Sequence, residues 1–227
     1  MLAVVYDVHG NLPALDAVLA DAAAAGADAF LLGGDYCALG AWPLEVLARL
    51  DALPDARWIR GNHERWLAAD RSDMPANAVL TGALAHERAV LPAARIAALG
   101  ALPATAAGDG VLFCHASPES DMAGFEAEPR DGEAALLLGT TAPRVVVGHT
   151  HLQFRREIAG TELVNPGSVG LPLDGDRRAA YALIAPGGEL VLRRVDYDVE
   201  VAMAALRDID AVWSRTMAGW LEHARPG

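Results

Sequence analysis

Short apolar runs along the chain repeatedly end at polar residues. The run LAVVY at residues 2–6 is followed by Asp-Val-His-Gly-Asn, and AFLLGG is followed by an aspartate. The same happens at three further places, before residues 61–64, before residue 115 and before residues 148–151. Short continuous apolar runs bounded by turn residues are typical of buried strands. The pattern therefore predicts a series of strands that carry polar side chains at their carboxyl ends.

Helix-like segments lie between several of these runs. Residues 13–25 open with a proline and carry Leu15, Val18 and Leu19 at helical spacing, and residues 43–52 also open with a proline. Proline favours the first turn of a helix. Strands that alternate with helices indicate an α/β fold, in which ligands gather at the carboxyl ends of the strands. We therefore expect the polar clusters to meet at one edge.

After residue 160 the rhythm changes to short strands without helices between them. The segments TELVN, RRAAYALIA and ELVLRRVDY predict strands, and the Gly-Gly pair at 187–188 predicts that the last two form a hairpin. We expect a second, partly antiparallel sheet here. Residues 198–224 carry apolar side chains at helical spacing, which predicts a C-terminal helix packed on one domain that spans residues 1–227. A homo-oligomer interface is the alternative interpretation of the same apolar stripe.

Composition narrows the classes of function. The formal net charge of −12 argues against broad nucleic-acid binding, which needs many cationic contacts. All the basic residues are arginines, so a Schiff-base lysine and the GxxxxGK[ST] phosphate loop are excluded. No segment approaches the roughly 18 apolar residues of a membrane span, and the start lacks the basic region of a signal peptide. We therefore expect a cytoplasmic protein with no membrane partner.

Most of the histidines lie at the predicted strand ends, together with aspartates and an asparagine. One such histidine is commonly a hydrogen-bonded structural residue, but several on one edge indicate a metal site. Imidazole and carboxylate ligands suit Mn and Fe, and also Ni, Co and Zn, better than Mg alone. The set exceeds one tetrahedral site and would fit two divalent metal ions roughly 3.5 to 4 Å apart that share a carboxylate. Its members are Asp7, His9, Asp35, Asn62, His63, His115, His149 and His151.

The spacing of these residues predicts how they converge. Residues two apart in an extended segment face the same side, so Asp7 with His9, and His149 with His151, are expected to present their side chains in one direction. Asp35 follows two glycines and has no basic neighbour in the sequence. We expect Asp35 to bridge the two metals, with the glycines allowing a close approach of the backbone.

Together these motifs resemble the calcineurin-like metallophosphoesterase superfamily. The matching elements, in order, are Asp7-x-His9, Gly34-Asp35, Gly61-Asn62-His63-Glu64, His115 and Gly148-His149-x-His151. The later run NPGSVG at 165–170 resembles the small bacterial branch that includes the YfcE-type phosphoesterases. The resemblance implies an α/β fold built as a four-layer αββα sandwich, in which two mixed β-sheets are flanked by helices.

The resemblance also implies a role for each matched residue. The implied ligands of one metal are Asp7, His9, Asp35 and His151, and those of the other are Asp35, Asn62, His115 and His149. His63 would be the catalytic residue, which donates a proton to the leaving oxygen or stabilises the transition state. Asn11 and Glu64 would orient a histidine or a metal-bound water from behind the ligands. A helix cap or a simple turn is the alternative for each of these two.

The implied activity is hydrolysis of a small phosphate ester, a phosphodiester or a nucleotide, by attack of a hydroxide that bridges the metals. A phosphoprotein phosphatase is one alternative. Those enzymes continue Asp-Arg-Gly where this chain has Ala-Leu-Gly at 38–40, so their phosphate-binding arginine is missing. A metal-binding module without significant catalysis is the other alternative.

Two features are expected to shape the substrate pocket. Tyr6 stands where the resemblance leads one to expect Ser or Gly before the first aspartate, and it is expected to narrow one side of the pocket. The irregular segments 71–78 and 116–130 are expected to select the substrate.

Overall fold

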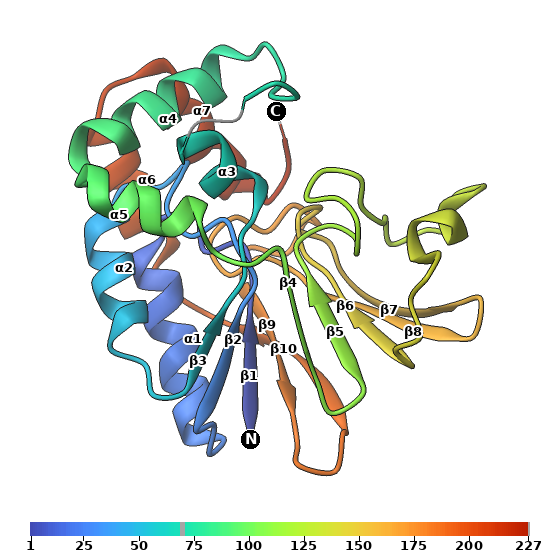
Figure 1. Cartoon of the computed structure of the whole chain (residues 1–227). Coiled ribbons are helices and arrows are strands. Elements are labelled where there is room, and N and C mark those ends of the chain that lie inside the picture. The colour runs from blue at the N-terminus through green and yellow to red at the C-terminus, as the bar shows by residue number, and fades with distance from the viewer. Residues whose placement is uncertain (69–70, 227) are drawn as a thin grey trace.

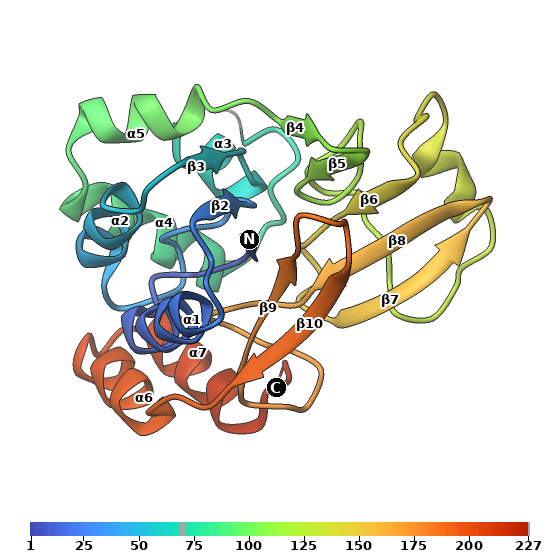
Figure 2. The same cartoon turned by 90° about the horizontal axis from the view of Figure 1, so that it is seen from below.

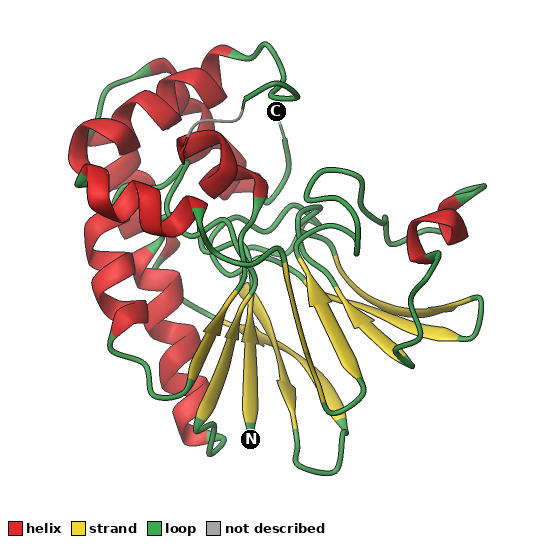
Figure 3. Ribbon diagram, in the orientation of Figure 1, coloured by secondary structure: helices red, strands yellow, loops and turns green. Residues whose placement is uncertain are grey.

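The computed structural model describes residues 1–68 and 71–226. Two five-stranded sheets stand against each other, and the α-helices gather on one side of them (Figures 1 and 3). The α/β fold with two mixed β-sheets is thereby confirmed.

The elements follow the predicted alternation in the first half of the chain. The first sheet contains β1 (Leu2–Val5), β2 (Ala29–Leu32), β3 (Ala56–Trp58), β9 (Ala179–Ile184) and β10 (Leu190–Val195). The second contains β4 (Thr105–Gly108), β5 (Val111–Cys114), β6 (Arg144–Val146), β7 (Gln153–Ile158) and β8 (Thr161–Pro166). The helices are α1 (Leu12–Ala24), α2 (Pro43–Asp51), α3 (Asn62–Ala68), α4 (Ala78–Val90), α5 (Ala93–Gly100), α6 (Val199–Asp208), α7 (Val212–His223) and the 3-10 helix η1 (Glu133–Leu137).

The predicted hairpin forms, but it extends the first sheet. The strand order of that sheet is β10-β9-β1-β2-β3, with β1, β2 and β3 parallel and β9 antiparallel to β1. The second sheet has the order β4-β5-β6-β8-β7 and takes the TELVN segment as part of β8. The expectation that all three late segments build the second sheet is therefore wrong. β9 pairs with the edge of β1 that β2 leaves open, and all six residues of β9 are buried.

Alternate residues of β1 serve two different cores. Ala3 and Val5 face the helices and pack in the larger core, whereas Val4 and Tyr6 face the second sheet. A strand that is buried on both faces reads as a continuous apolar run, which explains LAVVY. The view from below shows β1 and its neighbours between the helices and the second sheet (Figure 2).

The outer face of the second sheet has a thinner cover. Phe125 and Leu137, from the segment between β5 and β6, pack there against Val145 and Leu163. The cover therefore consists of a loop and η1, while the described α-helices lie over the first sheet (Figure 3). This arrangement leaves the loops at the carboxyl ends of the strands to form one rim.

The helices predicted at 13–25 and 43–52 are confirmed as α1 and α2. The single C-terminal helix expected over 198–224 is instead the pair α6 and α7. Asp210 has a left-handed backbone with φ of 54°, which ends the first helix, and aspartate tolerates this conformation better than most residues. Ser214 then accepts a hydrogen bond from the backbone N–H of Ala211 and starts the second helix. Within the described residues, none of the helices combines the length and apolarity needed to cross a membrane.

Candidate metal centre

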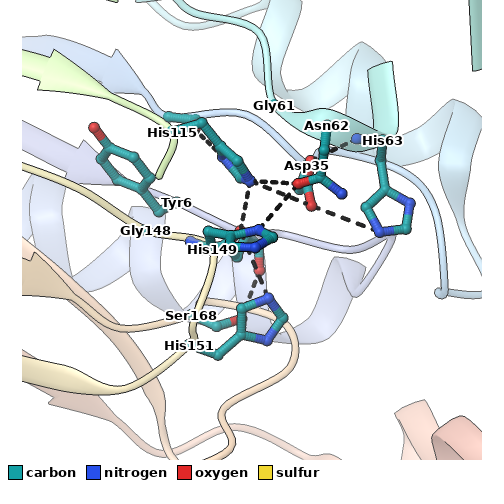
Figure 4. Close-up of polar contacts among 12 residues, drawn as sticks. Tyr6, Asp35, Gly61, Asn62, His63, His115, Gly148, His149, His151 and Ser168 are labelled. Atoms are coloured by element: carbon teal, nitrogen blue, oxygen red, sulfur yellow. Dashed lines mark hydrogen bonds and ion pairs between the residues drawn. The ribbon is translucent and has the colours of Figure 1, made fainter. Parts of the chain in front are cut away.

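The candidate ligands gather at the rim where carboxyl ends of strands from both sheets meet (Figure 4). Three groups of side chains are close enough to share a metal ion, because the donor atoms within each group lie within 4.8 Å of one another. The groups are Asp7 with His9 and His151, His9 with Asp35 and His63, and Asp7 with Asp35 and His115. The predicted convergence is therefore present. It joins two sheets rather than the edge of one, because β5 and β6 contribute His115 and the 148–151 turn.

Five of the candidate ligands have a left-handed backbone. The φ angles are 53° for Asp7, 46° for His9, 56° for Asp35, 67° for His149 and 59° for His151. Each such residue costs on the order of 1–3 kcal/mol and persists only where its surroundings impose it. The expected extended geometry is therefore wrong. The chain turns at both members of each pair. Asp7 and His9 reach one group of donors, whereas His149 contacts Asn62 and His151 contacts His9.

Two imidazole nitrogens face each other at the centre of the site. His9 Nε2 lies 3.1 Å from His151 Nε2. His9 Nδ1 donates to the carbonyl of Ala38 at 2.8 Å, and His151 Nδ1 donates to that of Leu171 at 2.6 Å. Burial lowers the pKa of His9 well below its usual value and that of His151 to about 3, so both rings stay neutral. Because each proton is held on Nδ1, two lone pairs are aimed at one point, which a cation would satisfy.

A second group of donors converges on Asn62. Its Oδ1 lies 2.9 Å from His115 Nε2 and 3.1 Å from His149 Nδ1. His115 Nδ1 donates to the carbonyl of Gly33 at 2.9 Å. Burial opposes protonation, but Asp35 and Asp7 raise the pKa of His115 to about 10, so Nε2 presents a lone pair only when a bound cation displaces its proton. These donors form a second place for a cation.

Asp35 stands between the two groups. Its Oδ2 lies 3.5 Å from His115 Nε2 and 3.9 Å from His9 Nε2, which suits a shared carboxylate. Asp7 Oδ1 lies 3.6 Å from His151 Nε2, is buried, and has no hydrogen-bond partner in the described part of the chain. Burial raises the pKa of Asp7 to about 8, so a nearby cation would be needed to hold it ionised at neutral pH. The donor set therefore fits two divalent metals.

His63 lies beside the candidate ligands at the start of α3. Its Nε2 is 3.7 Å from Asp35 Oδ2, and its backbone N–H donates to Asp35 Oδ1 at 3.0 Å. The Nδ1 atom is buried and lacks a hydrogen-bond partner in residues 1–68 and 71–226. The ring packs edge-on against Trp66 at 5.2 Å between centroids. His63 thus keeps a ring nitrogen uncommitted next to the centre.

Glu64 fixes the backbone around Asp35. Its carboxylate accepts hydrogen bonds from the N–H groups of Asp35, Tyr36 and Gly61 at 2.8 to 2.9 Å. Burial and the neighbouring Asp35 raise the pKa of Glu64 to about 7, while the three donors oppose this rise. Glu64 therefore contacts the backbone of one candidate ligand rather than a histidine ring.

Asn11 and Ser168 hold the first loop from the other side. Asn11 caps α1 by accepting from the N–H of Ala14 at 3.2 Å, and its amide donates to the carbonyl of Gly170 at 2.8 Å. Ser168 is fully buried and donates to the carbonyl of Asp7 at 2.7 Å. Sequence reasoning missed this role of Ser168. The available signal was a buried-strand pattern that runs straight into the polar NPGS turn.

The glycines before Asp35 make room for neighbouring protein atoms. A Cβ on Gly33 would lie 2.1 Å from the ring of Tyr6, and one on Gly34 would lie 2.5 Å from the backbone nitrogen of Gly61. Gly148 also lies against this ring, and a Cβ there would be 2.4 Å from a ring carbon. These glycines let three loops pack at van der Waals contact. The expected close approach of the backbone to the metals stays a prediction.

Tyr6 lies between the sheets beneath the site. It is fully buried, and its hydroxyl lies 3.2 Å from the carbonyls of both Cys114 and Val146, at the ends of β5 and β6. The prediction that Tyr6 narrows the substrate pocket is wrong, because β1 directs this side chain into the inter-sheet core. Tyr6 instead ties the two sheets together directly below the histidines.

A pocket of about 470 Å³ opens beside His115. Its walls include Arg60 and Arg65 and residues from both segments that were expected to select the substrate, such as Asp73 and Ser117. The arrangement places an open volume next to the candidate metal centre. The selecting role of these segments stays a prediction.

Known proteins resemble this chain in sequence and in fold. The family model of the calcineurin-like phosphoesterase superfamily domain matches residues 1–186. A metallophosphoesterase from Sphaerobacter thermophilus is 26% identical, with a TM-score of 0.84 over 98% of both chains. The hypothetical protein PH1004 from Pyrococcus horikoshii shares the fold at 18% identity, with a TM-score of 0.85 over the whole of both chains.

A relative from Methanocaldococcus jannaschii, the uncharacterized protein MJ0912, is 28% identical over 225 residues, which cover 89% of this chain and 90% of that protein. The model match covers most of the chain and includes every candidate ligand. The chain therefore belongs to the calcineurin-like phosphoesterase superfamily and is a phosphoester hydrolase.

Proposed function

We propose that this protein hydrolyses a small phosphate ester, either a phosphodiester or a nucleotide, at a centre of two divalent metal ions. The observation that carries the proposal is the pair of lone pairs on His9 and His151, 3.1 Å apart and fixed by backbone carbonyls. Two like dipoles aimed at one buried point are unfavourable unless a cation lies between them. The second convergence, on Asn62, supports the same proposal.

The proposed ligand sets follow from the donor groups. The first set is Asp7, His9, Asp35 and His151, and the second is Asp35, Asn62, His115 and His149. Mn or Fe is proposed, with Ni, Co and Zn as further candidates, because imidazole with carboxylate suits these metals. When bound, the two cations would activate a water molecule and neutralise charge on the phosphoryl oxygens.

His63 is the proposed general acid. The unpartnered Nδ1 has no competing acceptor inside the described protein, so a proton on it can be given to a leaving oxygen. The Asp35 carboxylate would position His63, because it accepts a hydrogen bond from the backbone N–H of His63 and lies 3.7 Å from the ring Nε2. Glu64 would keep Asp35 in place through the amides that it binds, and Asn11 would do the same for the first loop through Gly170.

The first test is metal stoichiometry on protein purified without added metal or chelator. Hydrolysis of bis-aryl phosphate and aryl phosphate is then measured with Mn, Fe, Ni, Co, Zn and Mg. About two metals per chain with metal-dependent turnover is the expected result. Full occupancy without turnover of either ester would instead favour a binding module. Higher activity on phosphopeptides than on nucleotides would favour a phosphoprotein phosphatase.

Replacing His63 separates catalysis from metal binding. In His63→Gln, kcat is expected to fall by about 10²- to 10⁴-fold, the usual contribution of a general acid, while the metal content stays at the wild-type value. His223→Gln is the control, because His223 is exposed at the end of α7. Unchanged kcat in His63→Gln would remove His63 from the mechanism.

A further inference from the structure

Arg65 binds two loops at once from its position on α3, two residues after His63. Its Nε and Nη2 donate to the carboxylate of Asp121, both at 2.7 Å. Its Nη1 and Nη2 donate to the carboxylate of Asp73, both at 2.8 Å. The side chain of Arg65 is 13% exposed and that of Asp121 is 16% exposed. The planar guanidinium therefore holds two carboxylates in fixed positions.

The two aspartates come from the segments on either side of the pocket. Asp73 lies in the segment between α3 and α4 and also accepts a hydrogen bond from Trp66 Nε1 at 2.9 Å. Asp121 lies in the loop that follows His115, directly after the turn in which Ser117 N–H donates to Ser120 at 2.8 Å. Arg65 thus connects the segments that border the open volume next to the candidate metal centre.

The same contacts set the charge of the pocket wall. Asp73, Glu119 and Asp121 all line the pocket, and Arg65 pairs with two of these three carboxylates. Arg65 holds the pKa of Asp73 low, at about 2, so this carboxylate is ionised at neutral pH. Without the guanidinium, the carboxylates of Asp73 and Asp121 would repel each other, so the two segments would lose the contact that holds them together.

We infer that Arg65 is a positioning residue that holds the segments around Asp73 and Asp121 together and so sets the shape and charge of the pocket for the group beyond the phosphoryl. This inference rests on the proposed phosphoesterase function and deepens it. The paired segments contact the nucleoside or second alcohol of a diester. A phosphate monoester with a small aryl group reaches the metals and His63 without needing these contacts.

The experiment compares two substrates that share one leaving group, an aryl phosphate and the aryl ester of thymidine 5′-monophosphate. In Arg65→Gln, KM for the nucleotide ester is expected to rise at least about tenfold, whereas kcat/KM for the aryl phosphate changes by less than about threefold. Arg65→Lys keeps the positive charge but loses the planar guanidinium that binds each carboxylate through two hydrogen bonds, so an intermediate rise in KM is expected. Asp121→Asn tests the same contact by changing the carboxylate that Arg65 binds.

Arg130→Gln is the matched control. Arg130 pairs with Glu126 at 2.6 Å in the same long loop, but its side chain is 63% exposed. Hydrogen–deuterium exchange provides a readout independent of activity. Residues 71–77 and 117–123 are expected to exchange faster in Arg65→Gln and Asp121→Asn, and at the wild-type rate in Arg130→Gln.

Equal losses on both substrates in Arg65→Gln, or a loss of bound metal, would overturn the inference, because Arg65 would then support the centre itself. Unchanged KM and unchanged exchange would overturn it as well. A different outcome marks failure of the proposed function, namely a wild-type protein that hydrolyses neither ester with any metal. In that case the role assigned to Arg65 in substrate choice falls too.

Discussion

Gly33 shows how one missing side chain sets the geometry of the site. A Cβ on Gly33 would lie 2.1 Å from a ring carbon of Tyr6. The ring is fully buried and hydrogen-bonded at its far end, so it has no free direction in which to move. Asp35 follows two residues later. Strain at Gly33 would therefore reach a candidate ligand directly.

Gly33→Ala is expected to lower the free energy of unfolding by about 1–3 kcal/mol, the usual cost of overpacking a core. Urea denaturation with metal chelated measures this loss. Gly187→Ala is the control, because a Cβ there would have no neighbour within 4 Å and its φ is not in the left-handed region. Equal stability of the two variants would show that the Tyr6 ring can shift at little cost.

At the scale of elements, α4 and α7 pack on each other through a glycine. A Cβ on Gly82 of α4 would lie 2.8 Å from the buried Trp213 of α7, whereas a Cβ on Gly219 of α7 would have no neighbour within 4 Å. The two positions lie in helix interiors but in opposite environments. One glycine is required for packing, and the other only weakens its helix.

Gly219→Ala is expected to raise the free energy of unfolding by about 0.8–1 kcal/mol, because alanine has the higher helix propensity. Gly82→Ala is expected to lose stability, since contact with Trp213 outweighs that gain. Urea titrations of both variants measure the difference. A stabilising effect at Gly82 would mean that α7 can move away from α4 without cost.

At the scale of the whole molecule, the rim between the sheets concentrates buried carboxylate and imidazole groups. Metal binding to the folded state alone should therefore stabilise the protein. At a metal concentration a hundred times Kd, each site is expected to add about 2.7 kcal/mol to the free energy of unfolding. For a chain of this size, each kcal/mol corresponds to a rise in Tm of about 2–4 °C.

Scanning calorimetry of chelator-treated protein, with and without added Mn, measures this shift. A rise of about 10 °C or more is expected if both sites fill, given the stabilisation per site and its effect on Tm. His63→Gln should keep the shift, whereas Asp35→Asn should reduce it, because Asp35, unlike His63, is proposed to hold metal. A Tm that is the same with and without Mn would contradict the proposed centre.

The sequence by itself determined the fold class and the family, together with the positions of the candidate site residues. These features are local, because each strand is a short apolar run and each polar cluster directly follows one, as at Asp7 and Asp35. A short pattern of this kind needs no knowledge of the partner strand. The first two helices were equally readable from their prolines and spacing.

Only the tertiary structure decided features that depend on distant segments. The hairpin of β9 and β10 joins the first sheet because β9 pairs with β1, about 180 positions earlier in the chain. Tyr6 lies between the sheets because Gly33 and Gly148 leave space for it, and Arg65 meets Asp121 across 56 residues. The left-handed backbone at Asp7 and His9 is imposed by such packing. Local pattern cannot specify these contacts, because their free energy arises only when both segments are in place.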